Sequence, residues 1–400
     1  MANEKWLISI CAGWQQKQSL LNAKSLGINV IAFDADINAP CRSIVDLFFP
    51  IDICNSVEII KKIEQIGIVP IAVVSFISDL GMKSAGIVND YFKTGGMSEK
   101  LANKLTNKKL QRQCWESLGV FNPNWVSIDD LTGSKFKAIV NQFAEKEVMI
   151  KPIDSAGSRG IHKIKNLNMN DMQILKESIR SSLTGEIIIE EYIDGREFSI
   201  ESFWDKGVCE ILAISERFVL NDRTATSIIS IKLPSELENI IKDANIKANL
   251  ALGVQFGLTH TELILDKENR PFLLETAGRG GGFYVFDGLV PKVSGIDYSK
   301  VFIEQLTKQK PSNHQIGKKK LAAIRYIPSQ EGIIKSISGF EIVNKIKGIN
   351  AGCFVKKGDL TKACYSDADR LGYVLAWGES KKELEQLFMQ ASSLIEINYY

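Results

Sequence analysis

The first hundred residues alternate short apolar runs with longer amphipathic stretches. Apolar runs cover residues 6–11, 28–33 and 71–75, and the spacing predicts a helix over about residues 15–25 and another before residue 71. Strands and helices in this order predict an α/β unit with a parallel, Rossmann-like sheet. Asp34 or Asp36 could hold a ribose, but the first strand is followed by CAGWQQKQ, which lacks G-x-G-x-x-G. We therefore interpret the sheet as a scaffold and part of a substrate pocket, and not as an NAD site.

Residues 259–282, THTELILDKENRPFLLETAGRGGG, predict two strands joined by a polar turn. Side chains in a strand alternate faces, so His260, Glu262 and Ile264 share one face. A carboxylate on the same face as an isoleucine is costly to bury without a partner. Glu262 and Glu275, from neighbouring strands, would give Mg²⁺ two oxygen ligands and leave room for phosphates. An exposed hairpin with surface acids is the alternative interpretation.

Two further segments could bind an anion. Residues 148–152 predict a strand that carries Lys151, and the loop 154–160 that follows contains glycines and serines whose N–H groups could form an anion-binding nest. It lacks the G-K-[ST] ending of a Walker loop. Lys108 stands at the start of a predicted helix, where backbone N–H groups favour anions. A mobile hairpin tip and a solvated surface lysine are the alternatives.

After a helix predicted near residues 172–182, the segment EIIIEEYIDGREFSIESF predicts a strand, a break and a second strand. Asp194-Gly195 is by itself a plausible hairpin turn. The free backbone groups of a strand end could also pair with an adenine edge, and Glu197 could accept hydrogen bonds from ribose hydroxyls.

Composition narrows the class of protein. A length of 400 residues predicts two or three domains, and 45% hydrophobic with 24% charged residues is ordinary for a globular protein. A net charge of +2 gives no indication of nucleic-acid binding, and no apolar run reaches the length of a membrane span. The seven cysteines are scattered, without C-x-x-C pairs, and the N-terminus has no cleavage pattern. These features predict a cytoplasmic protein without a zinc site or disulfide framework.

The ordered set of Lys108, Lys151 with its glycine loop, EEYI with Glu197, and Glu262, Glu275 and Arg279 resembles the ATP-grasp superfamily over about residues 108–298. Within it, KPIDSAGSRG, HTE, ETAGRGGG and DADRLGYVLAWGES are most similar to the carboxylate–amine ligases of the L-amino acid ligase (dipeptide synthetase) branch. The resemblance implies an ATP-grasp fold with an N-terminal domain (1–106), an ATP-grasp domain (107–306, its lid about 123–191) and a C-terminal α+β subdomain (315–400). A polar stretch, 307–320, is the predicted linker.

The resemblance also implies roles for individual residues. Lys108 and Lys151 would contact ATP phosphates, Met149 and Ile264 would pack on adenine, and Glu262 and Glu275 would carry Mg²⁺, with Mn²⁺ as an alternative. Arg279, with Lys151, would be catalytic and would stabilise the acyl phosphate or the tetrahedral species. The implied nucleotide-binding set is completed by Ser155, Gly157, Ser158, Arg159, Glu190, Glu191, Tyr192, Ile193 and Glu197.

One position departs from the family pattern. The second metal ligand of Glu-x-Asn-x-Arg is replaced by Ala277, which puts the occupancy of a second metal in doubt. The implied activity is ADP-forming ligation of a carboxylate, activated as an acyl phosphate, to an amine. Candidate substrate contacts are His260, Gly280, Gly281 and Arg325, although a buried histidine and a surface arginine are ordinary structural features. The alternatives are a degenerate ATP-binding sensor and a carboxylase that activates bicarbonate. The expected partners are small molecules, with a homodimer as the default assembly.

Overall fold

The computed structural model describes residues 5–131, 133–220, 224–309, 312 and 314–400. The N-terminal unit is a parallel sheet of order β3-β2-β1-β4, as the sequence predicts. Its strands are β1 (Trp6–Ile10), β2 (Asn29–Phe33), β3 (Leu47–Phe49) and β4 (Ala72–Val74). Its helices are α1 (Lys17–Ser25), α2 (Ser56–Ile66) and α3 (Asp79–Phe92), and α4 (Glu99–Leu105) follows α3.

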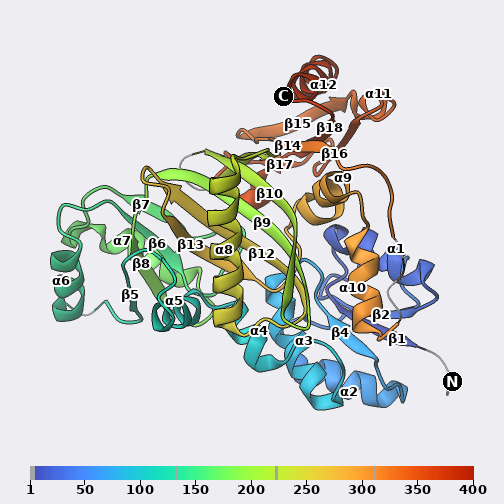
Figure 1. Cartoon of the computed structure of the whole chain (residues 1–400), viewed down its shortest axis with the longest axis horizontal. Helices are drawn as coiled ribbons and strands as arrows, with labels where there is room; N and C mark the ends of the chain where they lie inside the picture. Colours follow the sequence, from blue (N-terminus) through green and yellow to red (C-terminus); the bar gives the residue numbers. More distant parts are fainter. Residues whose placement is uncertain (1–4, 132, 221–223, 310–311, 313) are drawn as a thin grey trace.

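A small antiparallel sheet of order β5-β8-β6-β7 projects from one side of the molecule (Figure 1). It contains β5 (Trp125–Ile128), β6 (Val148–Pro152), β7 (His162–Ile164) and β8 (Ile187–Glu191), covered by α6 (Gly133–Gln142) and α7 (Met172–Arg180). The helix α5 (Lys108–Ser117) leads into it, and Asn107 caps that helix by accepting a hydrogen bond from the Leu110 N–H. The small sheet has its own hydrophobic core, which includes Phe136 and Ile150.

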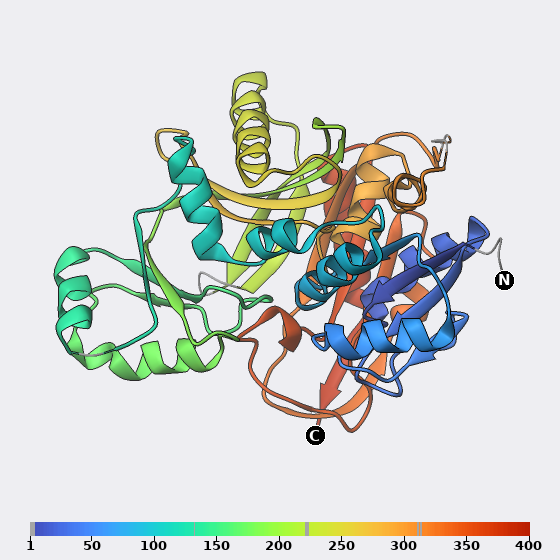
Figure 2. The same cartoon turned by 90° about the horizontal axis from the view of Figure 1, so that it is seen from below.

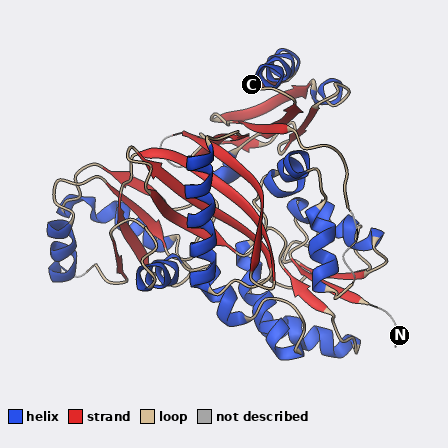
Figure 3. Ribbon diagram, viewed as in Figure 1, coloured by secondary structure: helices blue, strands red, loops and turns tan. Residues whose placement is uncertain are grey.

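The largest sheet has eight strands in the order β13-β12-β9-β10-β11-β14-β18-β16, and Figure 3 shows it crossing the middle of the molecule. Its strands are β9 (Gly195–Asp205), β10 (Val208–Leu220), β11 (Thr224–Ser230), β12 (Gly257–Asp266), β13 (Pro271–Ala277), β14 (Leu321–Ile327), β16 (Ile349–Cys353) and β18 (Gly372–Gly378). Strands from the predicted C-terminal subdomain therefore extend the same sheet that carries Glu262 and Glu275.

One face of the central sheet is covered by α8 (Ser235–Leu252), which lies above the strands in Figure 2. Leu263 and Leu265 of β12 pack against Ile241 and Ala248 of this helix. His260, Glu262 and Ile264 point to the opposite face, as the period of two predicts. That opposite face is turned toward the N-terminal sheet and the small sheet (Figure 2).

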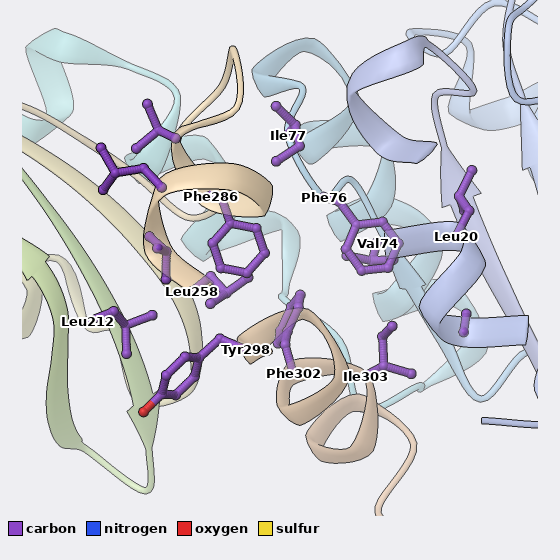
Figure 4. Packing of buried hydrophobic residues seen from close by; sticks show 14 of the residues in the cluster. Leu20, Val74, Phe76, Ile77, Leu212, Leu258, Phe286, Tyr298, Phe302 and Ile303 are labelled. Carbon is purple, nitrogen blue, oxygen red and sulfur yellow. The ribbon is translucent and has the colours of Figure 1, made fainter. Parts of the chain in front are cut away.

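The remaining elements join the units. A three-stranded sheet consists of β15 (Gly332–Ser338), β17 (Leu360–Thr361) and β19 (Glu396–Tyr399), near α11 (Phe340–Val343) and α12 (Lys381–Leu394). The π-helical turn η3 (Val285–Leu289), α9 (Val290–Ser294) and α10 (Tyr298–Leu306) lie between the N-terminal and central sheets. Figure 4 shows Phe286 of η3 and Phe302 of α10 between Leu212 of the central sheet and Val74 of the N-terminal sheet, and Ile303 of α10 belongs to the same cluster.

Three features of the fold bear on the sequence predictions. The segment after β8 is not a hairpin turn, because β8 pairs with β5 and β6 whereas β9 pairs with β10 and β12. Asp194-Gly195 instead connects two different sheets, and a Cβ at Gly195 would lie 2.1 Å from the Leu265 carbonyl oxygen. Residues 310, 311 and 313 of the predicted linker lie outside the described residues. No helix in the described part of the chain is long and apolar enough to span a membrane.

Candidate functional site

Two cavities open on the face of the central sheet that α8 leaves uncovered. The first, of about 320 Å³, lies between the small sheet and the central sheet, and we call it the small-sheet cavity. The second, of about 400 Å³, lies where the N-terminal sheet, the central sheet and the segment 367–370 meet, and we call it the junction cavity. The two cavities share lining residues, namely Lys108, Ser158, Ile161, Arg217, Glu262 and Glu275.

The shared wall contains the two carboxylates that the hairpin predicts. Glu262 of β12 and Glu275 of β13 are direct partners in the strand register. Glu275 accepts from the Lys108 ammonium at 2.9 Å, and the same lysine donates to the Ser155 carbonyl oxygen at 3.1 Å. Lys108 is almost fully buried. The start of α5, the glycine loop and β13 are thus held together around one ammonium group.

Glu262 is surrounded by cations. Its carboxylate accepts from Arg217 at 2.6 Å and lies 3.2 Å from His260 Nε2. Burial would raise the pKa of Glu262, but Arg217 and His260 hold that pKa well below its usual range. Burial would lower the pKa of His260, whereas Glu201 and Glu262 raise it to about 9. The site therefore holds ionised carboxylates beside positive charge.

The Glu262 and Glu275 carboxylates fit the ligand preferences of Mg²⁺. Both supply carboxylate oxygens to the wall shared by the two cavities, and oxygen ligands are the donors that Mg²⁺ prefers. The described residues contain no group of three or more His, Cys, Asp or Glu side chains arranged as a metal cage. Because Mg²⁺ is usually bound through one or two carboxylates with water and phosphate oxygens, the pair fits that ion. Ala277 lies opposite His260 in the register and supplies no further ligand.

The small-sheet cavity is lined by most of the residues predicted to bind nucleotide. Met149, Lys151 and Glu190 reach it from β6 and β8, and Ile264 and Glu197 reach it from the central sheet. The segment that joins the two sheets also lines this cavity, through Glu191, Tyr192 and Ile193. The Glu191 and Tyr192 N–H groups already donate to Asn124 and Glu147 carbonyl oxygens within the small unit. A ligand there would have to use other backbone groups of this segment.

A buried ionic network supports the floor of that cavity. Glu190 is 1% exposed and forms ion pairs with Lys151 at 2.7 Å and with the Arg112 Nη2 at 2.6 Å. Burial opposes ionisation, but the two cations lower the pKa of Glu190. Arg112 belongs to α5 and also donates to the Leu274 carbonyl oxygen of β13. This network fixes the small sheet against the central sheet and orients the Lys151 ammonium.

Glu197 has an unpredicted partner. Its carboxylate forms an ion pair with Arg217, which also pairs with Glu262. Burial raises the pKa of Glu197, and Arg217 opposes that effect. Arg217 thus lies between the carboxylate predicted for ribose and one predicted for the metal. A charged residue inside the strand sequence AISERFVL was an available signal, of the same kind that identified Glu262.

The glycine loop, residues 154–160, borders both cavities. Ser155, Gly157, Ser158 and Arg159 line the junction cavity, and Gly157 and Gly160 each have a φ of 69°. Asp154 anchors the base of the loop by accepting from the Leu183 and Thr184 N–H groups at 3.0 and 2.9 Å. Arg159 is exposed and donates to the Ala156 carbonyl oxygen.

Arg279 lines the junction cavity and is held by a residue of the N-terminal unit. Its guanidinium forms a two-point ion pair with Asp79 at the start of α3, with Nε 2.7 Å from Oδ1. Burial would lower the pKa of Arg279, and Asp79 raises it. No sequence motif indicated Asp79, because it is 200 positions away along the chain.

Three of the candidate substrate contacts lie apart from the two cavities. Gly280 and Gly281 lie outside the linings of both cavities, and a Cβ at Gly281 would lie 2.5 Å from Glu201 Oε1. The glycine run is therefore a packing requirement at these two positions. Arg325 also lies outside both linings, and its guanidinium pairs with Glu385 of α12 at 2.6 Å. Its side chain is half-buried against Phe388 of α12, apart from both cavities.

His260 does line the junction cavity, in contact with a carboxylate that the sequence interpretation missed. Glu201 is 2% exposed, pairs with His260 Nδ1 and accepts from the Gly281 N–H at 3.0 Å. It follows Glu197 at a spacing of four in the same strand, so strand alternation places both on one face. The position of Glu201 could therefore have been inferred from that of Glu197.

Comparison with known proteins gives two family matches. Residues 144–287 match the ATP-grasp domain, and residues 325–400 match the L-amino acid ligase C-terminal domain 2. The chain is 24% identical over 296 residues to the alanine–anticapsin ligase of Bacillus subtilis (strain 168), a match that covers 68% of this chain. The same match spans 58% of that curated relative, somewhat over half of its length.

Solved structures show the same fold. The L-amino acid ligase from Bacillus licheniformis superposes with a TM-score of 0.82 at 20% identity, over 99% of each chain. The biotin carboxylase domain of the Hydrogenobacter thermophilus 2-oxoglutarate carboxylase superposes with a TM-score of 0.79 at 17% identity. That match covers 99% of this chain and 91% of the other, which was crystallised with MgADP and bicarbonate.

Proposed function

We propose, from the premise that this chain is an ATP-grasp protein carrying an L-amino acid ligase C-terminal domain 2, that it is an ADP-forming carbon–nitrogen ligase. Its substrates would be a carboxylate, in the first instance that of an amino acid, and an amine. The observation that carries the proposal is the carboxylate pair of Glu262 and Glu275, which forms part of the wall shared by the two cavities. Nucleotide would occupy the small-sheet cavity, and the joined substrates would occupy the junction cavity.

The chemistry that such a site must perform is defined by the poor reactivity of a carboxylate toward amines. Transfer of the terminal phosphoryl group of ATP to the carboxylate forms an acyl phosphate; attack by the amine then forms the amide and releases phosphate. Positioning and charge stabilisation account for most of the catalysis of phosphoryl transfer. Mg²⁺ held by Glu262 and Glu275 would neutralise phosphate charge when bound.

The protein side chains have distinct tasks in this proposal. Lys108 and Lys151 would hold phosphate oxygens, because their buried ammonium groups line the small-sheet cavity. Arg279 would stabilise negative charge on the acyl phosphate and the tetrahedral species, with Asp79 fixing its planar fork. The glycine loop would close over the phosphates and exclude water, which would otherwise hydrolyse the acyl phosphate.

The decisive experiment measures nucleotide products with pairs of candidate substrates. The purified protein is incubated with Mg²⁺–ATP and pairs of amino acids, and the nucleotides are separated by chromatography. ADP and phosphate that form only when a carboxylate and an amine are both present support the ligase. AMP as the product would contradict the acyl-phosphate route.

Two further outcomes separate the alternatives. ADP release that depends on bicarbonate would favour a carboxylase, an activity for which the fold of the biotin carboxylase domain is the motivating observation. Tight ATP binding without release of ADP under any pair would favour a sensor. Homodimerisation and two-metal binding are separate expectations, to be tested by light scattering and by metal titration.

A further inference from the structure

The junction cavity has a wall that the nucleotide assignments do not use. It is formed by the 3₁₀ turn η4 (Asp367–Asp369), the following Arg370, and Tyr326 of β14. Asp367 and Arg370 both line the cavity and form an ion pair with each other. Their side chains are 15% and 3% exposed, respectively. A buried pair of opposite charges beside a substrate cavity requires an explanation.

The turn that carries the pair is rigid. Ser366 and Asp369 form a capping box, in which the Asp369 carboxylate accepts from the Ser366 N–H and hydroxyl at 2.8 Å. The Leu371 N–H donates to the Ile327 carbonyl oxygen at 2.8 Å, which ties the end of the turn to β14. Asp367 and Arg370 are therefore presented to the cavity by a fixed backbone.

Two aromatic rings pack against the guanidinium of Arg370, and at least one of its N–H donors makes no hydrogen bond with the described residues. Its carbon centre lies 3.8 Å from the Tyr326 ring centroid and 4.9 Å from that of Phe283. Nη2 donates to the Ala225 carbonyl oxygen at 2.7 Å and to Asp367. Among the residues that the structure describes, the buried Nε has no hydrogen-bond partner. Because buried polar atoms are nearly always paired, this arginine has capacity for another acceptor.

The other arginines and the lysine of this cavity also have partners. Arg279 is paired with Asp79, Arg217 with Glu197 and Glu262, and Lys108 with Glu275, while Arg159 donates to the Ala156 carbonyl oxygen. Arg370 differs in that its ionic partner, Asp367, lies three residues before it in the same turn. A small rearrangement of that pair would present one positive and one negative group, adjacent to each other, to a ligand.

We infer that Asp367 and Arg370 form the subsite for a free α-amino acid that serves as the amine substrate. Arg370 donates to the α-carboxylate of that amino acid, and Asp367 accepts from its ammonium group before the amine attacks. The ligand chemistry is a zwitterion, whose adjacent opposite charges complement those of the pair. The inference rests on the proposed function, and it specifies that the product keeps a free carboxylate, as a peptide does and a simple amide does not.

The test compares an amino acid with its carboxamide as the amine substrate. Each L-amino acid that supports ADP release in the substrate screen is paired with its amide, for example L-alanine with L-alaninamide. We expect the wild-type protein to favour the acid in kcat/KM by about 10- to 100-fold, the range for a hydrogen bond to a charged group. Arg370→Met should bring the ratio close to one, mainly through KM, and Arg370→Lys should restore part of it.

Arg325→Met is the matched control. Arg325 is another arginine of the C-terminal region that stacks on an aromatic ring, Phe388 at 4.2 Å, and pairs with one acid, but it lies outside both cavities. Its replacement should leave the acid-to-amide ratio unchanged. ATP affinity and the thermal unfolding midpoint establish whether Arg370→Met and Arg370→Lys are folded. An unchanged ratio in both folded Arg370 variants would overturn the subsite.

A binding measurement separates failure of the subsite from failure of the ligase proposal. Saturation-transfer NMR detects L-amino acids and their amides on the protein with a non-hydrolysable ATP analogue and Mg²⁺. Selective binding of the acids that Arg370→Met abolishes supports the subsite even if no ADP is released. ADP release with amides as effective as acids contradicts the subsite while the ligase proposal stands. No selective binding of any amino acid also contradicts it.

Discussion

The small-sheet cavity and the junction cavity share a wall but are assembled from the chain in different ways. The small-sheet cavity is lined by residues 108–275, so its walls come from one continuous portion of the sequence. The junction cavity is lined by residues from Cys11 to Arg370, drawn from the N-terminal sheet, the central sheet and η4. A cavity built from a continuous portion can be inferred from ordered motifs, whereas one built from distant segments depends on how the units pack.

The difference extends to the ion pairs. In the small-sheet cavity, Lys151 and Glu190 lie on the paired strands β6 and β8. In the junction cavity, Arg279 pairs with Asp79 across 200 positions of sequence. We therefore expect substitutions at the shared wall to impair both nucleotide binding and ligation, and substitutions confined to the junction cavity to impair ligation alone.

Glu275→Gln should have the largest effect, because Glu275 belongs to the shared wall. The amide keeps the shape but removes a charged oxygen ligand and the ionic partner of Lys108. We expect turnover to fall by about 10³-fold or more, with weaker Mg²⁺-dependent nucleotide affinity. Calorimetry with Mg²⁺–ATP and an ADP-release assay measure the two effects.

Glu268→Gln, in the exposed turn between β12 and β13, is the control and should change neither quantity. If Glu275→Gln retained full turnover at ordinary Mg²⁺ concentration, the metal assignment at the shared wall would be wrong.

Arg279→Met should give the next largest effect, and it should be confined to the junction cavity. The substitution keeps an apolar stem but removes the charge and the donor fork. We expect amide formation to fall by about 10²–10³-fold, the scale for loss of one transition-state donor. ATP affinity should stay within a few-fold of wild type. Collapse of ATP affinity would instead assign Arg279 to the nucleotide site.

Asp79→Asn tests how Arg279 is positioned. It leaves the guanidinium in place but weakens the two-point ion pair, so the loss of amide formation should be smaller than for Arg279→Met. An equal loss in both variants, with intact folding, would mean that the ion pair itself and not the arginine charge is required.

Nucleotide should slow trypsin cleavage of the glycine loop, by a factor smaller than the losses of activity expected for the substitutions above. Arg159 is exposed in that loop, whereas Lys163 lies within β7, so trypsin should cut the apo protein after Arg159 in preference to Lys163. Mg²⁺–ATP should slow this cut several-fold if phosphate contacts order the loop. Cleavage after Lys206, in the exposed turn between β9 and β10, provides an internal control that nucleotide should not affect. Equal slowing at both sites would indicate general stabilisation and not loop closure.

The contrast between the cavities also explains how far the sequence could predict this protein. The strand–helix alternation of the N-terminal unit, the β12–β13 hairpin and the face shared by His260 and Glu262 follow from local periodicity, and the structure has them as predicted. The continuous eight-stranded sheet was not predictable in this way, because β11–β14 pairing joins segments about a hundred residues apart.

The same reasoning applies to the side chains of the site. Lys108 and Glu275 were named from motifs, but their contact depends on α5 packing against β13. Arg217 and Asp79 have no motif, and each becomes notable only through a partner on another element. Arg370 belongs to the segment DADRLGYVLAWGES, but that segment did not indicate its contact with Ala225 of β11. Arg325 is the converse case, since its position in the sequence does not indicate that its side chain pairs with Glu385 of α12.

The smallest expected effect is on stability and concerns the seam between the N-terminal and central sheets, which is formed by η3, α9 and α10. Asp287 of η3 lies near Asp297, and the Ser19 hydroxyl of α1 donates to it at 3.5 Å. Burial and the Asp297 charge raise the pKa of Asp287 from 3.8 to about 7. The folded state therefore favours the protonated acid. The stability associated with that proton is complete below about pH 4 and is lost as the pH rises through about 7.

Asp287→Asn replaces the acid by a neutral side chain of the same shape. It should therefore stabilise the protein at pH 8, by about 1–2 kcal/mol once solvent screening of this half-buried group is allowed for, and much less at pH 5. Thermal unfolding at the two pH values measures the difference. Asp297→Asn is the contrasting variant, since Asp297 also caps α10 and accepts from Asn22, and it should lose stability at both pH values. Because the seam joins the N-terminal unit to the central sheet, Asp287→Asn should leave ATP affinity unchanged. A pH-independent effect of Asp287→Asn would show that Asp287 is ionised in the folded protein throughout this range.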